Sequence, residues 1–172
     1  MLKITLALCV LLPTVSPSFA VDDLSVWTGI SPRKVVVVDG DTLVLDGRTT
    51  QLYGINAPAR SQTCRSFRTG QDWPCGQDAA RILRILVGGG IACRIAPKEL
   101  SLNRTAAICF AGPFEVNAEM VIRGWAVAEW LQSADPREPP SVHRYMIYQE
   151  AAEDLEAGIW DSVFEPPERW AD

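Results

Sequence analysis

The sequence has no apolar run of the roughly 20 residues that a membrane-spanning helix requires. Its main apolar run, Ile4 to Leu12, is shorter than that. The chain has one histidine, His143, to which we assign no role, and no CxxC pair of the kind that typically binds zinc. It also lacks internal repeats and low-complexity segments. These absences argue against membrane-spanning, repeat and zinc-dependent proteins and favour one folded domain.

The first 20 residues have the features of a secretory signal peptide. Lys3 precedes the apolar run, and small residues lead to Ala20. A charged start, an apolar middle and a small-residue cleavage site are typical of exported proteins. We therefore predict cleavage after Ala20 and a periplasmic or secreted chain of residues 21–172 without a membrane span. The alternative is a retained N-terminal anchor.

Charge is distributed unevenly along the predicted mature chain. Residues 21–100 contain ten Lys and Arg against eight Asp and Glu, whereas residues 101–172 contain five against thirteen. An anionic ligand is therefore expected to approach the N-terminal half. The net acidity disfavours nucleic acid as a partner, because non-specific affinity for it depends on neutralising phosphates.

Four of the five cysteines lie in the predicted mature chain: Cys64, Cys75, Cys93 and Cys109. An even number in an exported chain predicts two disulfides. Three pairings are open, and we favour Cys64–Cys75 with Cys93–Cys109 because each closes a short loop. A disulfide closing a loop of about 15 residues stabilises a protein by roughly 3 kcal/mol.

The apolar pattern predicts an α+β domain that is mainly β and has about three helices. Apolar and β-branched runs predict buried or half-buried strands at 35–38, 41–45, 49–55, 91–95, 105–110 and 126–129. Asp46-Gly47 predicts a hairpin, since both positions of a type I′ turn need positive φ. Apolar spacing and terminal glycines predict helices at 77–87, 116–123 and 142–157. We interpret residues 21–34 as a lead-in and 60–76 as a loop.

Five segments resemble, in order, the thermonuclease (staphylococcal nuclease-like) family. They are VVVVDGDTLVL, QLYGINAP, NRTAAICF, VNAEMVIRGWA and EAAEDLEAGIW. The cysteine placement and the WPCG run are similar to an exported bacterial branch. The resemblance implies a five-stranded oligonucleotide-binding (OB-fold) barrel with appended helices over residues 35–161, followed by a tail at 162–172.

The resemblance also implies a chemistry, because active members of this family hydrolyse phosphodiester bonds of DNA and RNA with calcium. Their site needs two aspartates and a backbone carbonyl for calcium, a glutamate for the attacking water, and two arginines for the phosphate. Calcium prefers hard oxygen ligands, water activation needs a base, and guanidinium groups match the transition-state oxygens.

Carried over residue by residue, this pattern is present only in part. The resemblance places the first calcium aspartate at Asp41 and the second arginine at Arg104, and both are retained. The second aspartate position holds Asn56, a neutral oxygen donor. The glutamate position holds Ala59 and the first arginine position holds Gln51. We therefore expect a weak calcium site at Asp41 and Asn56, with Arg104 a vestige of the catalytic pair.

Simpler interpretations of the same residues stay open at this stage. The Asp39-Gly40-Asp41 segment is either a polar turn or a cation site. The arginine-rich stretch 60–68 is either a solvated face or a ligand contact, and Arg60 is its candidate for substrate binding. Arg104 fits an ordinary surface residue equally well. The tryptophans fit packing roles or a sugar-stacking platform: Trp125, Trp130, Trp160 and Trp170.

Two functional hypotheses follow. The first is an exported, catalytically degenerate nuclease-like barrel that binds or assists in envelope or exopolysaccharide (succinoglycan-type) biosynthesis, an association that the resemblance implies for some relatives. Its partner would be a polysaccharide or an envelope protein. The second is a weak calcium-dependent nuclease acting on DNA or RNA. The missing base, the missing arginine and the net acidity favour the first.

Overall fold

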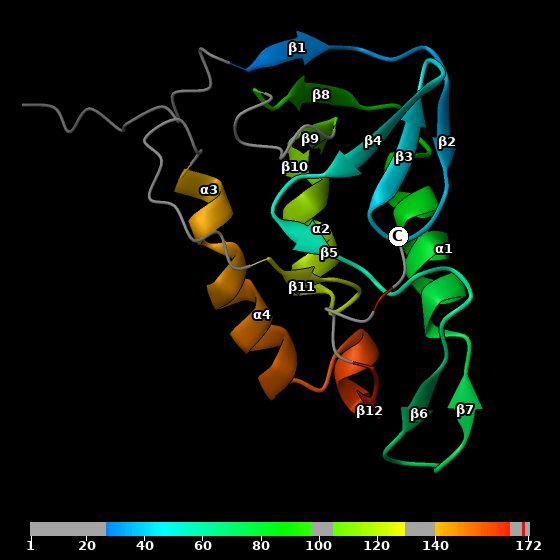
Figure 1. Ribbon diagram of the computed structural model, residues 1–172. Helices are drawn as coiled ribbons and strands as arrows, with labels where there is room; N and C mark the ends of the chain where they lie inside the picture. The colour runs from blue at the N-terminus through cyan, green and yellow to red at the C-terminus, as the bar shows by residue number, and fades with distance from the viewer. Residues whose placement is uncertain (1–26, 98–104, 130–139, 166–169, 171–172) are drawn as a thin grey trace, which may run out of the picture.

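The computed structural model describes residues 27–97, 105–129, 140–165 and 170 (Figure 1). The predicted signal peptide lies outside the described residues, as do Arg104 and Trp130. Within the described part, no helix combines the length and the apolar character that crossing a bilayer requires.

The domain is a mixed α+β structure made mainly of strands, as the sequence predicts. Its sequence-ordered strands are β1 Thr28–Ile30, β2 Val35–Val37, β3 Thr42–Leu45, β4 Arg48–Leu52, β5 Ile55–Asn56, β6 Cys64–Ser66, β7 Asp72–Trp73, β8 Ala92–Ile95, β9 Ala106–Ala111, β10 Phe114–Glu115, β11 Val127–Ala128 and β12 Ser162–Val163. Its helices are α1 Cys75–Val87, α2 Val116–Ile122, α3 Pro140–His143, α4 Tyr145–Asp154 and a 3-10 helix, η1 Gly158–Asp161.

The main sheet has the strand order β1-β8-β9-β4-β3-β2, with β10 paired to β9. Strands β2, β3 and β4 form an antiparallel meander, and β4 then runs parallel to β9. The hydrogen-bonded path is open, so the closed five-stranded OB-fold barrel is not confirmed. The two ends of the path, β1 and β2, are consecutive in the chain and are joined by residues 31–34.

The β3–β4 turn confirms the hairpin signal. Asp46 and Gly47 have φ of 49° and 88°, as a turn with two left-handed residues requires. The Asp46 carboxylate also accepts hydrogen bonds from the backbone N–H of Arg33, at 3.1 Å, and of Lys34, at 2.8 Å. The turn therefore ties the β1–β2 connection to the meander.

Several predicted elements differ from the structure in local detail. The predicted lead-in contains β1, and the predicted loop 60–76 contains the β6–β7 hairpin. The third predicted strand is divided into β4 and β5 at Gly54, which has a φ of 77°. The predicted helix 142–157 is divided into α3 and α4 at Arg144 and ends before Gly158. Strand β2 is not buried, since Val36 is 44% exposed.

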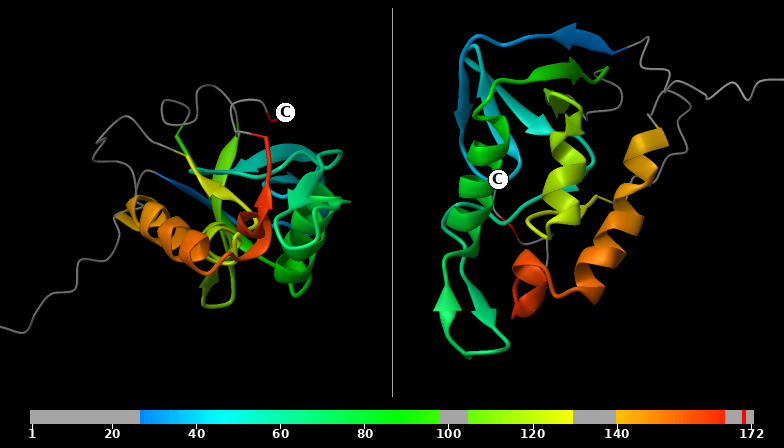
Figure 2. Two further views of the ribbon diagram at one scale, coloured as in Figure 1. Left: turned by 90° about the horizontal axis from the view of Figure 1, so that it is seen from below. Right: turned by 180° about the vertical axis from the view of Figure 1, so that it is seen from behind.

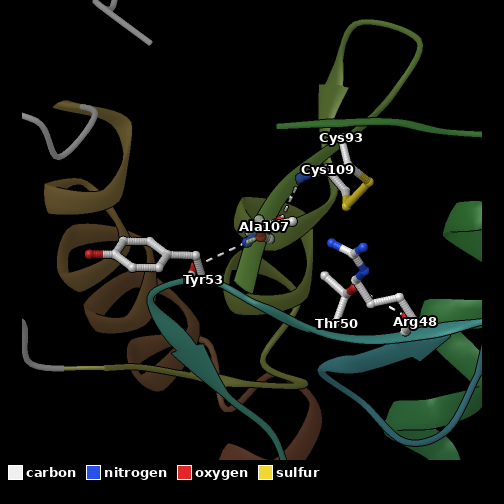
Figure 3. Close-up of a disulfide and its surroundings, with 7 residues drawn as sticks. Arg48, Thr50, Tyr53, Cys93, Ala107 and Cys109 are labelled. Atoms are coloured by element: carbon white, nitrogen blue, oxygen red, sulfur yellow. Dashed lines mark hydrogen bonds between the residues drawn. A yellow bond between two sulfur atoms is a disulfide. The ribbon is translucent and has the colours of Figure 1, made fainter. Parts of the chain in front are cut away.

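Both predicted disulfides are confirmed. Cys93 and Cys109 are register partners on β8 and β9, so their bond crosses between neighbouring strands. Arg48 and Thr50 of β4 lie beside this bond in Figure 3. Cys64–Cys75 joins the start of β6 to the start of α1. The second bond therefore fixes the β6–β7 hairpin to the helix that follows it.

The main core lies between the sheet and the helices α1, α2 and α4, which stand side by side in Figure 2. Helix α1 is amphipathic, and Ala79, Ala80, Leu83 and Val87 on its buried face are among the core residues. A second, smaller cluster surrounds the Cys64–Cys75 bond at the N-terminal end of α1 and is rich in aromatic rings.

Buried Asn117 fixes α2 to the sheet. Its amide nitrogen donates to the backbone oxygens of Tyr53, at 3.0 Å, and Ala107, at 3.1 Å, and its oxygen accepts from the N–H of Cys109. One side chain thereby bonds to three backbone groups, one where β4 turns into β5 and two on β9. Buried polar backbone groups require such partners.

Candidate functional site

Within the part of the chain that the structure describes, the positions to which the resemblance assigns site residues meet at one cleft of about 460 Å³. It lies between the turn that joins β2 to β3, the exposed face of β4 and the segment that follows β5. Asp39, Asp41, Gln51, Asn56 and Ala59 all line it. Positions that are up to 20 residues apart in the sequence are therefore neighbours, as the resemblance implies.

One wall of the cleft is the turn Asp39–Thr42, which we call the turn wall. The Asp39 carboxylate accepts from the backbone N–H of Asp41, at 3.2 Å, and of Thr42, at 2.8 Å. Asp41 is 5% exposed, and each of its carboxylate oxygens accepts a hydrogen bond. Thr42 Oγ1 donates to Oδ1 at 2.8 Å, and the N–H of Ala57 donates to Oδ2 at 2.7 Å. The Asp41 side chain therefore joins the turn to the segment after β5.

Burial raises the pKa of Asp41 to about 7, and the negative charge of Asp39 adds to the increase. The hydrogen bonds from Ala57 and Thr42 act in the opposite direction, because they stabilise the carboxylate. The increase shows that the charged form is poorly compensated inside the protein. A catalytic or metal-binding role is one explanation of such a group, and a structural network is another.

A second part of the lining consists of Gln51, Asn56 and Ala59, and we call it the neutral wall. Gln51 is paired with Thr42 in β3 and with Ala106 in β9, so its backbone is held on both sides. Its N–H also donates to the oxygen of Thr105 at 2.9 Å. The Gln51 side chain is therefore presented from a rigid part of the sheet. The wall carries two amides and a methyl group, with no formal charge.

Two glycines allow the cleft walls to approach the start of α1. A Cβ on Gly40 would lie 2.6 Å from the Cβ of Ala57 and 2.8 Å from that of Ala79. A Cβ on Gly76 would lie 1.8 Å from the backbone oxygen of Ala59. Contacts this short do not occur, so only glycine fits at either position. The backbone of Ala59 is therefore packed directly against the start of α1.

The oxygen donors of the cleft do not fit a resident calcium ion. Calcium takes six to eight oxygen ligands and depends on carboxylate charge for affinity. Both oxygens of Asp41 already accept hydrogen bonds, and Asn56 contributes no charge. Among the described residues, no group of three or more His, Cys, Asp or Glu side chains is suited to a metal ion.

The two predicted arginines differ in what the structure shows. Arg104 lies outside the described residues, although Thr105 lines the cleft. Arg60 is exposed and donates through Nη1 to the backbone oxygen of Val38 at 3.0 Å. Since Val38 lines the cleft, the Arg60 guanidinium lies near its edge.

Sequence reasoning missed four lining residues: Val38, Thr49, Ala57 and Thr105. One signal was available for Thr49, which is two residues before Gln51 in β4 and so lies on the same face of the strand. Thr105 enters the cleft because β9 pairs in parallel with β4, and a long-range pairing of this kind leaves no local signal.

Comparison with known proteins gives one distant relationship. No family model matches the chain. The chain is 30% identical over 127 residues to the succinoglycan biosynthesis protein ExoI of Rhizobium meliloti (strain 1021). The match covers 72% of this chain and 61% of that protein, so the chain spans less than two thirds of its relative's length. Membership of the thermonuclease family stays a prediction, while a distant relative is named for succinoglycan biosynthesis.

Proposed function

We propose that this protein is an exported, catalytically degenerate member of the thermonuclease-like fold that serves as a binding or accessory protein in exopolysaccharide biosynthesis. The observation that carries the proposal is the neutral wall. Gln51, Asn56 and Ala59 stand together in the cleft at positions where the family pattern requires an arginine, an aspartate and a glutamate.

The strand order is compatible with the barrel that this proposal includes. A meander of three strands, a parallel step from its third strand to the last, and an antiparallel return make up the OB-fold connectivity. The sheet has these steps in β2-β3-β4, β4–β9 and β9–β8. Strands β1 and β2 at its two ends are parts of one continuous segment, and that segment would close the barrel.

The expected loss of rate from having Ala59 and Gln51 in place of the family's glutamate and arginine supports a non-catalytic role. A general base contributes roughly 10²- to 10⁴-fold to a rate, and Ala59 cannot accept a proton. One transition-state donor contributes roughly another 10²- to 10³-fold, and Gln51 has no positive charge to supply. The two losses need not multiply. Either one alone would turn a fast nuclease into a poor one.

The biological context rests on the distant relative and on features compatible with export. The name of ExoI associates it with succinoglycan biosynthesis. The two disulfides suit an oxidising compartment, and no described helix is suited to span a membrane. We infer a periplasmic or secreted protein that meets a polysaccharide or an envelope protein.

A cleavage assay tests the loss of catalysis. Purified mature protein is incubated with single-stranded DNA and calcium beside an Asp41→Ala, Arg104→Ala double variant. We expect no calcium-dependent cleavage above that of the double variant. Cleavage by the wild type that the double variant abolishes would instead support the alternative, a weak calcium-dependent nuclease. The retained Asp41 and Asp39 in the cleft are the observation that keeps this alternative in view.

Restoration of the missing groups tests whether the cleft is a former nuclease site. In the Gln51→Arg, Asn56→Asp, Ala59→Glu triple variant, we expect measurable calcium-dependent cleavage, because the three groups would return to one cleft. The matched control adds the same three charges at exposed positions outside the cleft, as Gln71→Arg, Thr69→Glu and Thr63→Asp in or beside the β6–β7 hairpin. A well-folded but inactive triple variant would mean that the cleft is not arranged for phosphodiester hydrolysis.

The accessory role has a separate test in the source organism. Deletion of the gene should lower the yield or change the chain length of the exopolysaccharide. Complementation with Asp41→Ala should restore production if catalysis at the cleft is not required, provided that the variant accumulates to the normal level. An unchanged exopolysaccharide in the deletion strain would remove the biosynthetic role.

A further inference from the structure

We propose that the cleft binds a neutral hexopyranose unit of a glycan, in place of the phosphodiester that the nuclease pattern would bind. This inference rests on the proposed non-catalytic function and names the ligand class of the same site. The cleft volume of about 460 Å³ lies within the usual range for small-ligand sites, about 300–1,000 Å³. The cleft therefore has room for a sugar ring and part of its neighbour.

The charges at the cleft select against an anionic ligand. Its lining includes the carboxylate of Asp39, and none of the lining residues within the described chain is basic. A phosphate or a uronic acid would therefore meet negative charge on the turn wall, and like-charge contacts oppose binding. Arg60 lies near the edge, but it is exposed and donates to the Val38 carbonyl. An uncharged ligand avoids this repulsion.

The polar groups of the cleft match the hydroxyl groups of a sugar. A hydroxyl both donates and accepts, and the side-chain amide of Gln51 offers both a donor and an acceptor. Thr49 and Thr105 add hydroxyls to the lining. Gln51 and Thr49 lie on one face of β4, which is paired to β3 and β9. Groups held by a sheet keep their positions, which favours specific recognition.

The remaining surface is small and apolar. Val38 is 40% exposed, and Ala57 and Ala59 complete this part of the lining. Methyl groups of this size leave space for the C–H face of a pyranose, whereas a glutamate at position 59 would occupy that space. The described lining contains no aromatic ring for stacking. We therefore expect an affinity per sugar unit on the order of 1 mM, which a polymer would raise through repeated contacts.

An NMR titration tests the proposal with defined probes. Backbone amide signals of the mature protein are followed during addition of glucose, galactose and mannose to high millimolar concentration, without calcium. Galacturonic acid and a thymidine tetranucleotide serve as anionic probes under the same conditions. We expect shifts for Gln51, Asn56 and Thr105 with at least one neutral hexose, and smaller or no shifts with the anionic probes.

Variants link the binding to the cleft. Gln51→Ala and Thr49→Val each remove hydrogen-bonding groups and should raise the hexose Kd about five- to tenfold and two- to fivefold respectively. Gln71→Ala is the matched control, because Gln71 lines a separate hollow of about 250 Å³ beside the β6–β7 hairpin. Gln51→Arg should reverse the preference towards the tetranucleotide.

The outcomes separate this proposal from the one on which it rests. Absence of shifts with all three hexoses, shifts confined to residues away from the cleft, or a Kd that Gln51→Ala leaves unchanged would overturn the sugar assignment. In each case an inactive wild-type protein in the DNA assay would still support the non-catalytic function. Calcium-dependent cleavage of DNA would overturn both.

Discussion

The two walls of the cleft use polar residues in different ways. On the turn wall, Asp39 and Asp41 accept hydrogen bonds from the backbone of their own turn and from Ala57, and Asp41 is buried. On the neutral wall, Gln51 and Asn56 are half-buried and line the open cleft. On the first wall, Asp41 joins two segments of the fold, whereas on the second wall Gln51 presents its side chain to the cleft.

This difference bears on how a partly retained site is interpreted. The Asp-Gly-Asp-Thr segment has a structural reason to persist, since Asp41 joins two segments that are 16 residues apart. Its presence is therefore weak support for catalysis. On the neutral wall, Gln51 makes its structural contacts through its backbone, so the identity of its side chain reports more directly on the ligand.

The largest expected effect comes from the contact between the start of α1 and Ala59 of the neutral wall. Gly76→Ala would place a Cβ 1.8 Å from the backbone oxygen of Ala59, and a backbone atom cannot move aside without disturbing the wall. We expect the free energy of unfolding to fall by about 4 kcal/mol, at the upper end for overpacking. Urea denaturation measures this change.

Gly89→Ala is the control for that substitution. A Cβ on Gly89 would meet no atom within 4 Å. We expect a change in the free energy of unfolding within about 1 kcal/mol, because the substitution removes backbone freedom without creating a clash. Equal effects at Gly76 and Gly89 would contradict the close packing of α1 against the neutral wall.

The second prediction concerns the charge on the turn wall. Asp41→Asn keeps the shape of the side chain, and an asparagine can accept from the Ala57 N–H and donate to the Thr42 hydroxyl. The pKa of Asp41 is raised to about 7 from 3.8, so the folded state binds the proton more tightly than the unfolded state. The buried charge therefore destabilises the wild type progressively as the pH rises from about 4 to 7.

At about 1.4 kcal/mol per pKa unit, the rise from 3.8 to about 7 sets an upper limit of about 4 kcal/mol on the cost of the buried charge at pH 8. We expect Asp41→Asn to be more stable than wild type by about 3 kcal/mol at pH 8, because an amide does not fully reproduce the protonated carboxyl group. The advantage should disappear near pH 4, where Asp41 is protonated in the folded state. Thermal denaturation across this pH range measures it. A variant less stable than wild type at pH 8 would show that the turn wall needs the charge.

Much of the fold follows from local patterns in the sequence. The β3–β4 hairpin is marked by Asp46-Gly47, and the Cys93–Cys109 bond by a short loop between two strand-like runs. The division of the third strand at Gly54 was not predictable locally. There, a Cβ would lie 2.8 Å from Val142 and 3.2 Å from Tyr145, which come from distant helices. Tertiary packing determines where that strand bends.

The candidate site was predictable only as a set of aligned positions. The resemblance grouped Gln51, Asn56 and Ala59 with Asp41, and the structure places them around one cleft. The resemblance did not reveal that both carboxylate oxygens of Asp41 accept hydrogen bonds. The bond from the Ala57 N–H and the burial of Asp41 arise only when the chain is packed. The electrostatic state of Asp41 is thus a tertiary property that the motif does not contain.

A third prediction places charge on the neutral wall. The wild type should show no change in melting temperature on addition of calcium, because its donors do not fit the ion. Asn56→Asp adds a second carboxylate to the cleft and should create a weak site with a Kd near 1 mM. Calcium at ten times that concentration would then stabilise the variant by about 1.4 kcal/mol. Differential scanning calorimetry with and without calcium measures the gain.

Gln71→Glu is the matched control for the calcium experiment, since it adds one negative charge at an exposed position outside the cleft. It should show no comparable response to calcium. Stabilisation of the wild type by calcium, at a level similar to Asn56→Asp, would mean that the neutral wall does not limit metal binding and would favour the nuclease alternative.

The smallest expected effect is at the edge of the cleft, where Arg60 belongs to neither wall. Its guanidinium is exposed and donates to the Val38 oxygen at 3.0 Å, and exposed hydrogen bonds of this kind contribute little. Arg60→Gln should lower the free energy of unfolding by about 0.5 kcal/mol and leave hexose affinity within twofold of wild type. Urea denaturation and the NMR titration check both values. A tenfold loss of hexose affinity would place Arg60 in contact with the ligand and extend the binding surface beyond the two walls.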